Sequence, residues 1–294
     1  MKKFASLLLA LSLTFCLAGC GGTAAPQNDE QESVAQEETT PLPDDAAAPD
    51  DAELSGEDTV QAPDAEETAL TTVSPGKLTM STNAAFPPYE MTTDDGGFEG
   101  IDVEIAGKIA EKLGLELQID DMDFDSALLA VSMGKSDMVM AGVSVRPDRL
   151  AVMDFSDSYA TGVQVVIVPE DSDITLDNLG DHMIGTQRAT TGYLYCSDDY
   201  GEDHVTAYDN GMTAVQALKN GQVDCVVIDN APARVLVSQN PGLTILDTEY
   251  VVEDYAIGMS KENPALLAAV NNALAELKAD GSVQAVIDKY IPAE

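Results

Sequence analysis

The chain has no tryptophan and only two histidines in 294 residues. Neither His182 nor His204 belongs to a cluster with metal-ligand spacing, so we expect no metal and no cofactor. Basic residues are also scarce, with 14 Lys and Arg against 52 Asp and Glu and a formal net charge of −38. Because such a polyanion repels nucleic acid, the composition weighs against nucleic-acid binding. No nucleophilic triad or phosphate-binding loop is present either.

Long apolar runs are missing except at the N-terminus. There, Lys2 and Lys3 precede an apolar run that ends at Leu17 and is too short for a comfortable transmembrane helix. The following Ala-Gly-Cys20 resembles a bacterial lipobox, in which a diacylated cysteine becomes the mature N-terminus. We expect residues 1–20 to be a lipoprotein signal peptide and acylated Cys20, through palmitate or a similar chain, to anchor the protein on the extracytoplasmic face of the cell membrane. An ordinary secretory signal is the alternative.

The next segment lacks basic and aromatic residues altogether. Residues 21–74 contain fifteen Asp and Glu among Pro, Ala, Thr and Gln. Such a segment cannot bury enough apolar surface to offset its chain entropy, and its like charges repel one another. The sequence therefore predicts an acidic, disordered tether.

Cysteines are few, and two of the four fall within the expected signal and lipobox. Cys196 and Cys225 remain, in an exported protein where a disulfide is permitted. Cys225 lies in an apolar strand pattern, where a cysteine behaves as a small buried hydrophobic residue. Two free thiols are favoured, and a disulfide stays open.

From residue 77 onward, strand and helix patterns alternate. Residues 77–81 and 115–119 alternate as strands, and isoleucines four apart predict a helix with Asp102 at its cap. The β-α-β-α-β-α order predicts a mainly parallel sheet covered by helices, and the second half of the chain repeats this architecture. Near the C-terminus, residues 255–259 predict a strand, and Asn263-Pro264 predicts the start of a further helix.

One stretch carries a strong site signal. A short apolar strand pattern ends at Gly142, and Pro147 suits the first position of a helix because it lacks an N–H. Arg149 then lies in the first helical turn, where the helix dipole disfavours a cation. An arriving carboxylate would resolve this by meeting the guanidinium, the helix amides and the Ser144 hydroxyl. An ion pair of Arg149 with Asp148 or another surface acid is the alternative.

Seven motifs follow one another in a fixed order along the folded part of the chain. They are Thr82-Asn-Ala-Ala-Phe-Pro-Pro-Tyr-Glu, Gly100-Ile-Asp-Val-Glu, Met122-Asp-Phe, Ala141-Gly-Val-Ser-Val-Arg-Pro-Asp-Arg, Asp154-Phe-Ser-Asp-Ser-Tyr, Thr190-Thr-Gly and Val223-Asp-Cys-Val-Val-Ile-Asp. Together they resemble the polar amino-acid family of solute-binding proteins that serve ATP-binding-cassette (ABC) importers. The resemblance covers residues 77–292 and implies an α/β, two-lobed, periplasmic-binding-protein-like fold of type II, with two hinge crossings and a ligand cleft. Lobe 1 would comprise residues 77–163 plus 253–294, and lobe 2 residues 164–252.

The resemblance also implies contacts to a free α-amino acid. Arg149 and Ser144 would receive the α-carboxylate, helped by the backbone and hydroxyl of Thr191. The Gly142 carbonyl and the Asp229 carboxylate would receive the ammonium. Asp229 taken alone is equally suited to cap a helix. Ligand contacts on both lobes would favour the closed state.

The side chain of the ligand is expected between Phe86 and Phe124, although either ring could instead fill the core. Family members that bind basic amino acids generally have an acid at the position of Asn83. Arg188 would add positive charge near the end of the ligand side chain. Both features favour a neutral polar or acidic amino acid.

The expected function is to bind this amino acid by lobe closure and to deliver it to the transmembrane subunits of an ABC permease. We expect a monomer without enzymatic activity. The alternative is an enzyme resembling cyclohexadienyl dehydratase, which uses the same fold on a prephenate-like acid. It would need a general acid in the cleft, and Glu90 is the one acid that the Phe-Pro-Pro-Tyr loop brings near, without an evident partner.

Overall fold

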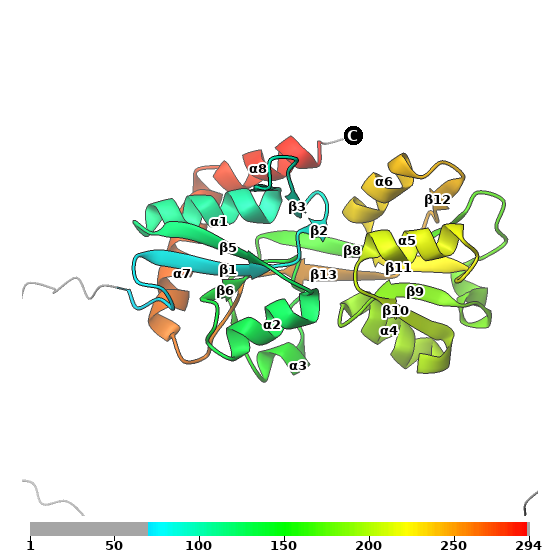
Figure 1. Cartoon of the computed structure of the whole chain (residues 1–294), viewed down its shortest axis with the longest axis horizontal. Coiled ribbons are helices and arrows are strands. Elements are labelled where there is room, and N and C mark those ends of the chain that lie inside the picture. The colour runs from blue at the N-terminus through cyan, green and yellow to red at the C-terminus, as the bar shows by residue number, and fades with distance from the viewer. Residues whose placement is uncertain (1–69, 293–294) are drawn as a thin grey trace, which may run out of the picture. The chain divides into compact units, whose positions relative to one another are not determined.

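The computed structural model describes residues 70–292. The predicted signal peptide, Cys20 and most of the predicted tether lie outside these residues. The described chain forms two α/β lobes, each built on its own sheet, with a small third sheet of β2, β3 and β4 (Figure 1). No helix among residues 70–292 is long and apolar enough to cross a membrane.

The first lobe contains a five-stranded sheet with the strand order β5-β1-β6-β14-β7. β1 pairs in parallel with β5 and β6, and β14 runs antiparallel to β6 and β7. The strands of this lobe are β1 (Lys77–Thr82), β2 (Ala85–Phe86), β3 (Glu90–Thr92), β4 (Phe98–Glu99), β5 (Glu116–Asp121), β6 (Met138–Val139), β7 (Asp154–Phe155) and β14 (Gly258–Met259). Its helices are α1 (Ile101–Lys112), α2 (Phe124–Ser132), α3 (Pro147–Leu150), α7 (Pro264–Ala279) and α8 (Ser282–Tyr290).

The second lobe contains a six-stranded sheet with the order β10-β9-β11-β8-β12, and β13 pairs with β8. Figure 1 shows α5 and α6 on one side of this sheet and α4 on the other. The strands are β8 (Ala160–Pro169), β9 (Ile184–Gln187), β10 (Val205–Tyr208), β11 (Cys225–Asp229), β12 (Leu243–Ile245) and β13 (Val251–Tyr255). The helices are α4 (Thr191–Tyr200), α5 (Gly211–Lys219), α6 (Asn230–Gln239) and the 3-10 turns η1 (Leu176–Asp181) and η2 (Glu202–His204).

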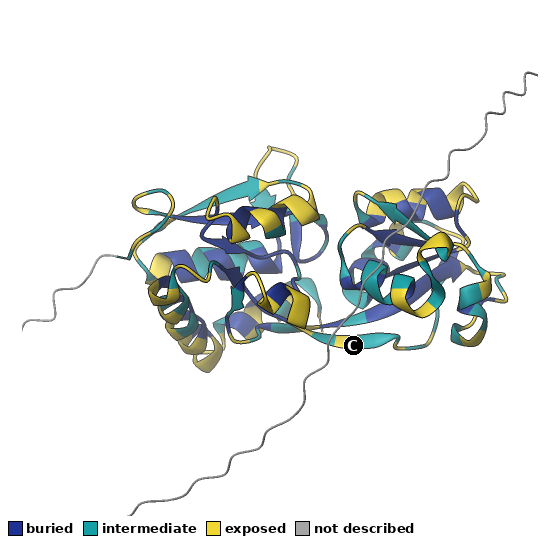
Figure 2. Cartoon of the chain, turned by 90° about the horizontal axis from the view of Figure 1, so that it is seen from below, coloured by how far each residue is buried: buried dark blue, intermediate teal, exposed yellow. Residues whose placement is uncertain are grey.

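Two antiparallel strands connect the lobes. The chain leaves the first lobe on β8 and returns on β13, and the pairing sets Gly162 opposite Glu253 and Ala160 opposite Tyr255. Figure 2 shows these strands passing between the two lobes. The predicted two-lobed α/β class with two crossings is confirmed, whereas the exact lobe boundaries stay a prediction.

Helix α7 follows the predicted start signal. The Asn263 side chain accepts a hydrogen bond from the Leu266 N–H at 3.2 Å, and Pro264 occupies the first turn, where no N–H is needed. The buried face of α7 packs into the core of the first lobe. Helix α8, which follows after Gly281, was not predicted.

The predicted cap at Asp102 is wrong. Helix α1 begins at Ile101 with Gly100 as N-cap, and Asp102 makes no cap hydrogen bond. Gly100 has φ 132°, and a Cβ there would lie 2.2 Å from the Tyr89 carbonyl oxygen, so glycine permits this close approach. Asp102 is instead fully buried and accepts a hydrogen bond from the Gly142 N–H at 3.0 Å.

The predicted single strand over residues 255–259 is also wrong. β13 ends at Tyr255 in the second sheet, and β14 (Gly258–Met259) belongs to the first sheet. The chain changes sheets between them, so its hydrogen bonds change partners there. Cys196 and Cys225 are free and buried in one apolar cluster, which confirms the favoured thiol state, and burial raises the pKa of each to about 12.

Gly162 in β8 provides a stability test of the crossing. A Cβ at Gly162 would lie 2.5 Å from the fully buried ring of Tyr255. We expect Gly162→Ala to lower the free energy of unfolding by about 1–3 kcal/mol, as overpacking does, measured by urea denaturation.

Gly107→Ala is the matched control. Gly107 lies inside α1, and a Cβ there meets nothing within 4 Å. Because alanine is the better helix former, this variant should gain about 0.5–1 kcal/mol. Equal effects of the two substitutions would contradict the assigned contact between Gly162 and Tyr255.

Candidate functional site

A cavity of about 320 Å³, including its open mouth, lies between the lobes. Eight of the nine predicted site residues line it, namely Asn83, Phe86, Phe124, Gly142, Ser144, Arg149, Thr191 and Asp229. Glu90, Ala141, Gln187 and Thr190 complete the lining.

Arg149 is a buried cation in the part of the cavity wall that the first lobe forms. It is 5% exposed and lies in α3, where Pro147 occupies the first turn as predicted. Its Nη1 donates to the Ser144 carbonyl at 3.0 Å, and its Nη2 donates to the Ala189 carbonyl of the second lobe at 3.0 Å. Its guanidinium carbon lies 5.4 Å from the centroid of the Phe124 ring.

No carboxylate among residues 70–292 forms an ion pair with Arg149. Asp148, its expected alternative partner, pairs with Arg146 at 2.9 Å. Burial lowers the pKa of Arg149, because desolvation penalises its charge. A desolvated guanidinium held only by carbonyl oxygens is a receptor for an external anion.

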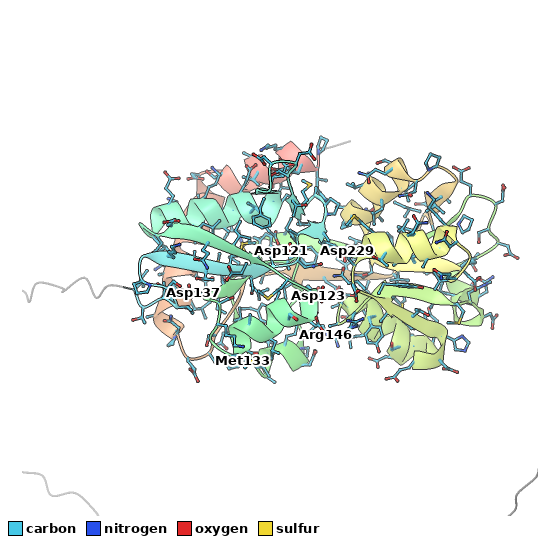
Figure 3. All side chains as sticks on the ribbon, in the orientation of Figure 1. Asp121, Asp123, Met133, Asp137, Arg146 and Asp229 are labelled. Carbon is cyan, nitrogen blue, oxygen red and sulfur yellow. The ribbon has the colours of Figure 1, made fainter. Side chains whose placement is uncertain are left out.

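Asp229 brings a buried acid to the wall on the second lobe. It ends β11 and is 8% exposed, and Figure 3 labels it where that lobe faces the first. Its Oδ2 accepts from Gln164 Nε2 at 2.8 Å, and its Oδ1 accepts from the Tyr255 hydroxyl. Although Asp229 stands at the N-cap of α6, its side chain makes no cap hydrogen bond. Burial raises its pKa to about 6.

Thr191 contributes its backbone more than its hydroxyl. The hydroxyl donates to Glu253 Oε2 at 2.6 Å and accepts from Gln164 Nε2 at 3.3 Å. Thr191 begins α4, with Thr190 as its N-cap. The amides of this first helical turn are the donors that an anion meets at a helix N-terminus.

Arg188 does not line the cavity. Its side chain is half exposed and pairs with Asp209 at 2.9 Å. Successive side chains at the end of a strand point to opposite sides, and here Gln187 faces the cavity while Arg188 faces away. The predicted contribution of Arg188 to ligand choice therefore has no geometric support.

Asn83 and Gln187 connect the lobes across the cavity. Gln187 Nε2 donates to Asn83 Oδ1 at 3.0 Å, and Asn83 Nδ2 donates to the Met122 carbonyl at 2.9 Å. Together with the Arg149 bond to Ala189, this holds the lobes in a closed arrangement. Sequence reasoning missed Gln187, although alternation along β9 was the available signal.

Glu90 is the second buried acid of the wall. It is 0% exposed, and neither of its carboxyl oxygens has a hydrogen-bond partner among the described residues. Burial raises its pKa well above the ordinary range, and the neighbouring Asp102 adds to this. The sequence named Glu90 only as a possible general acid.

Two α/β lobes joined by two strands, with a buried cation and buried acids facing a closed cavity, define the class of solute-binding proteins that close over a small polar ligand. The chain belongs to the bacterial extracellular solute-binding proteins, family 3, whose model matches residues 78–293. This membership confirms the family expected from the motifs and gives an extracytoplasmic location. The family is one of binding proteins and not of enzymes, so the dehydratase alternative loses its basis.

Named relatives agree with this family. The chain is 30% identical to ABC transporter arginine-binding protein 1 of Escherichia coli (strain K12), over 74% of this chain and 91% of that protein. It is 28% identical to the L-cystine-binding protein TcyJ of the same strain, over 74% and 84%. A solved structure of an ancestral arginine-binding protein bound to glutamine matches with a TM-score of 0.71 and 35% identity, over 75% of this chain and 100% of that one.

The raised pKa of Asp229 predicts a pH-dependent stability difference. An aspartate ordinarily titrates near 3.9, so a folded pKa of about 6 means that the ionised form is disfavoured in the fold. The cost is present above pH 6 and disappears as the pH falls toward 4. Asp229→Asn should therefore stabilise the ligand-free protein by about 1–3 kcal/mol at pH 8, with little gain at pH 4.

Urea denaturation of both proteins between pH 4 and pH 8 measures this difference. A gain that does not change with pH would contradict the assigned titration.

Proposed function

We propose that this chain binds a free amino acid between its lobes and delivers it to the transmembrane subunits of an ABC importer. The observation that carries this proposal is that a buried Arg149 of the first lobe, which forms no ion pair within residues 70–292, and a buried Asp229 of the second lobe line one cavity. A zwitterion brings one charge of each sign and neutralises both. The names of the arginine-binding and cystine-binding relatives support an amino acid as the ligand.

In this proposal the α-carboxylate binds Arg149, Ser144 and the amides at the start of α4. The ammonium binds Asp229 and the Gly142 carbonyl. Gly142 suits this position because it has φ 55° and because a Cβ there would lie 2.8 Å from the Phe86 ring. Since the contacts come from both lobes, the closed state binds the ligand more tightly and the ligand shifts the population toward it.

Phe86 and Phe124 are proposed to enclose the ligand side chain. Both rings line the cavity, and Phe124 already lies beside the Arg149 guanidinium. A planar group, such as an amide or a guanidinium, stacks well on an aromatic face.

We infer that this side chain is basic, which departs from the neutral or acidic preference of the sequence. That preference rested on Arg188 and Asn83. Arg188 lies outside the cavity, and the Asn83 amide is occupied by protein partners. Glu90 instead offers two buried carboxyl oxygens without partners, and a guanidinium would satisfy both.

Anchoring through Cys20, the tether of residues 21–74 and the monomeric state stay proposals. Cys20 lies outside the described residues, and an extracellular binding protein needs some means of staying near its importer. Metabolic labelling with a palmitate analogue should mark the wild type and not Cys20→Ala.

Thermal unfolding against a panel of amino acids tests the ligand class. The panel should include arginine, lysine, ornithine, histidine, glutamine, glutamate and cystine. A ligand at about 100 times its Kd adds about 2.7 kcal/mol, which shifts Tm by a few degrees. We expect the basic amino acids, arginine first, to give the largest shifts.

Substitution of two arginines distinguishes a cation that contacts the ligand from a cation at the protein surface. Arg149→Ala should weaken binding by about 2–5 kcal/mol, because it leaves the ligand carboxylate without its partner. Arg188→Ala should leave affinity nearly unchanged, because its exposed ion pair lies outside the cavity. Equal losses would refute the assigned roles, and stabilisation by glutamate or glutamine alone would refute the basic class.

A further inference from the structure

A pair of acids lies buried at the cavity wall without a cation. Glu90, on β3, and Asp102, in the first turn of α1, are both 0% exposed. Asp102 Oδ2 accepts from the Gly142 N–H at 3.0 Å. Neither Glu90 oxygen has a hydrogen-bond partner among residues 70–292 other than the Asp102 carboxyl group, with which Glu90 can share a proton. Two carboxyl groups buried side by side cannot both ionise without strong repulsion, so they share a proton.

The surroundings of the pair favour retention of that proton. Asp121 of β5 and Asp229 of β11 add negative charge that faces Glu90. Tyr89 and Tyr159 face the pair as neutral hydroxyls, because burial and the nearby acids raise the pKa of each. The one cation that lines the cavity from the described residues is Arg149, which the ligand carboxylate is proposed to take.

The two acids of the pair differ in how strongly each holds a proton. Burial raises the pKa of Asp102 to about 6, and hydrogen bonds from Gly142 partly offset this effect. Burial and Asp102 raise the pKa of Glu90 well above its ordinary value. Because the Gly142 N–H stabilises a carboxylate on Asp102 and no such donor reaches Glu90, the proton resides on Glu90, the member that lines the cavity.

We propose that the Glu90–Asp102 pair is a proton-exchange site that releases its proton to solvent when the cationic side chain of a basic amino acid reaches Glu90. This inference rests on the proposed function, because it needs a basic ligand. The balance is one cation in and one proton out, so the buried cavity gains no net charge. Glu90 becomes a carboxylate, which accepts two hydrogen bonds from a guanidinium.

A neutral side chain of the same shape should leave the proton in place. The protonated Glu90 can donate to an amide or ureido oxygen, so such a ligand exchanges no proton at this pair. Any proton that Asp229 releases to the α-ammonium is the same for both ligands. The difference between arginine and citrulline thus isolates the Glu90–Asp102 pair.

Isothermal titration calorimetry of the full chain measures this difference. Arginine and citrulline are each titrated at pH 7 in phosphate and in Tris, whose ionisation enthalpies differ, so the heat reports the number of protons released. We expect arginine to release up to one proton more than citrulline. Correspondingly, the Kd for arginine should fall by up to tenfold per pH unit between pH 6 and pH 8, relative to citrulline.

Glu90→Gln should remove the extra proton release and weaken arginine binding more than citrulline binding. Glu99→Gln is the matched control, because Glu99 is an exposed acid on the neighbouring strand β4 and should change neither. Asp102→Asn keeps an oxygen for the Gly142 N–H and removes the charge that holds the proton. It should reduce the release even if Glu90→Gln does not fold.

Two other outcomes would contradict the proton-exchange site, and one of them would also contradict the basic ligand class. Arginine binding with the same proton release as citrulline would overturn the proton-exchange site and leave the proposed function intact. Binding of neutral amino acids alone, without arginine, lysine or ornithine, would overturn the basic ligand class and the proton-exchange site together.

Discussion

The cavity keeps one cation and two acids away from water without pairing them with one another. Arg149 donates only to carbonyl oxygens, Asp229 accepts only from neutral donors, and Glu90 has no partner among the described residues. Desolvated charges of this kind cost free energy unless they are neutralised or paired. The fold tolerates them because they lie on two lobes, in the short helix α3 and at the ends of β3 and β11. A ligand with complementary charges relieves this cost.

The same network joins the ligand cavity to the crossing strands. Gln164 on β8 donates to Asp229 at 2.8 Å, and Glu253 on β13 accepts from the Thr191 hydroxyl at 2.6 Å. Glu253 also accepts from the Tyr195 hydroxyl at 3.1 Å, and the guanidinium of Arg146 lies 4.9 Å from the centre of that ring. Figure 3 labels Arg146 near the junction of the lobes. A change in the angle between the lobes therefore disturbs cavity contacts and hinge contacts together, which couples closure to binding.

Local sequence signals correctly predicted those helix starts that depend on residues close together in the chain. Pro147 and Asn263-Pro264 mark helix starts in the structure, because the missing N–H of proline and the Asn cap act within one turn. Eight of the nine site residues chosen from the ordered motifs line one cavity in the structure. The prediction failed for Arg188, because the direction of a side chain depends on the residue at which the strand ends. It also failed for Asp102, whose partner Gly142 lies 40 positions away, and an acid in a first helical turn usually faces solvent.

The charge count of the cavity explains why ligand choice was hard to infer from sequence. A zwitterion satisfies Arg149 and one acid, which leaves one acid over. That acid can meet a second cation, or it can remain protonated beside a neutral amide. One arrangement of side chains can thus suit either a basic or an amide ligand. Selectivity in such a cavity depends on how strongly Asp102 and its neighbours hold the proton on Glu90, and therefore on residues that lie behind the wall and touch no ligand.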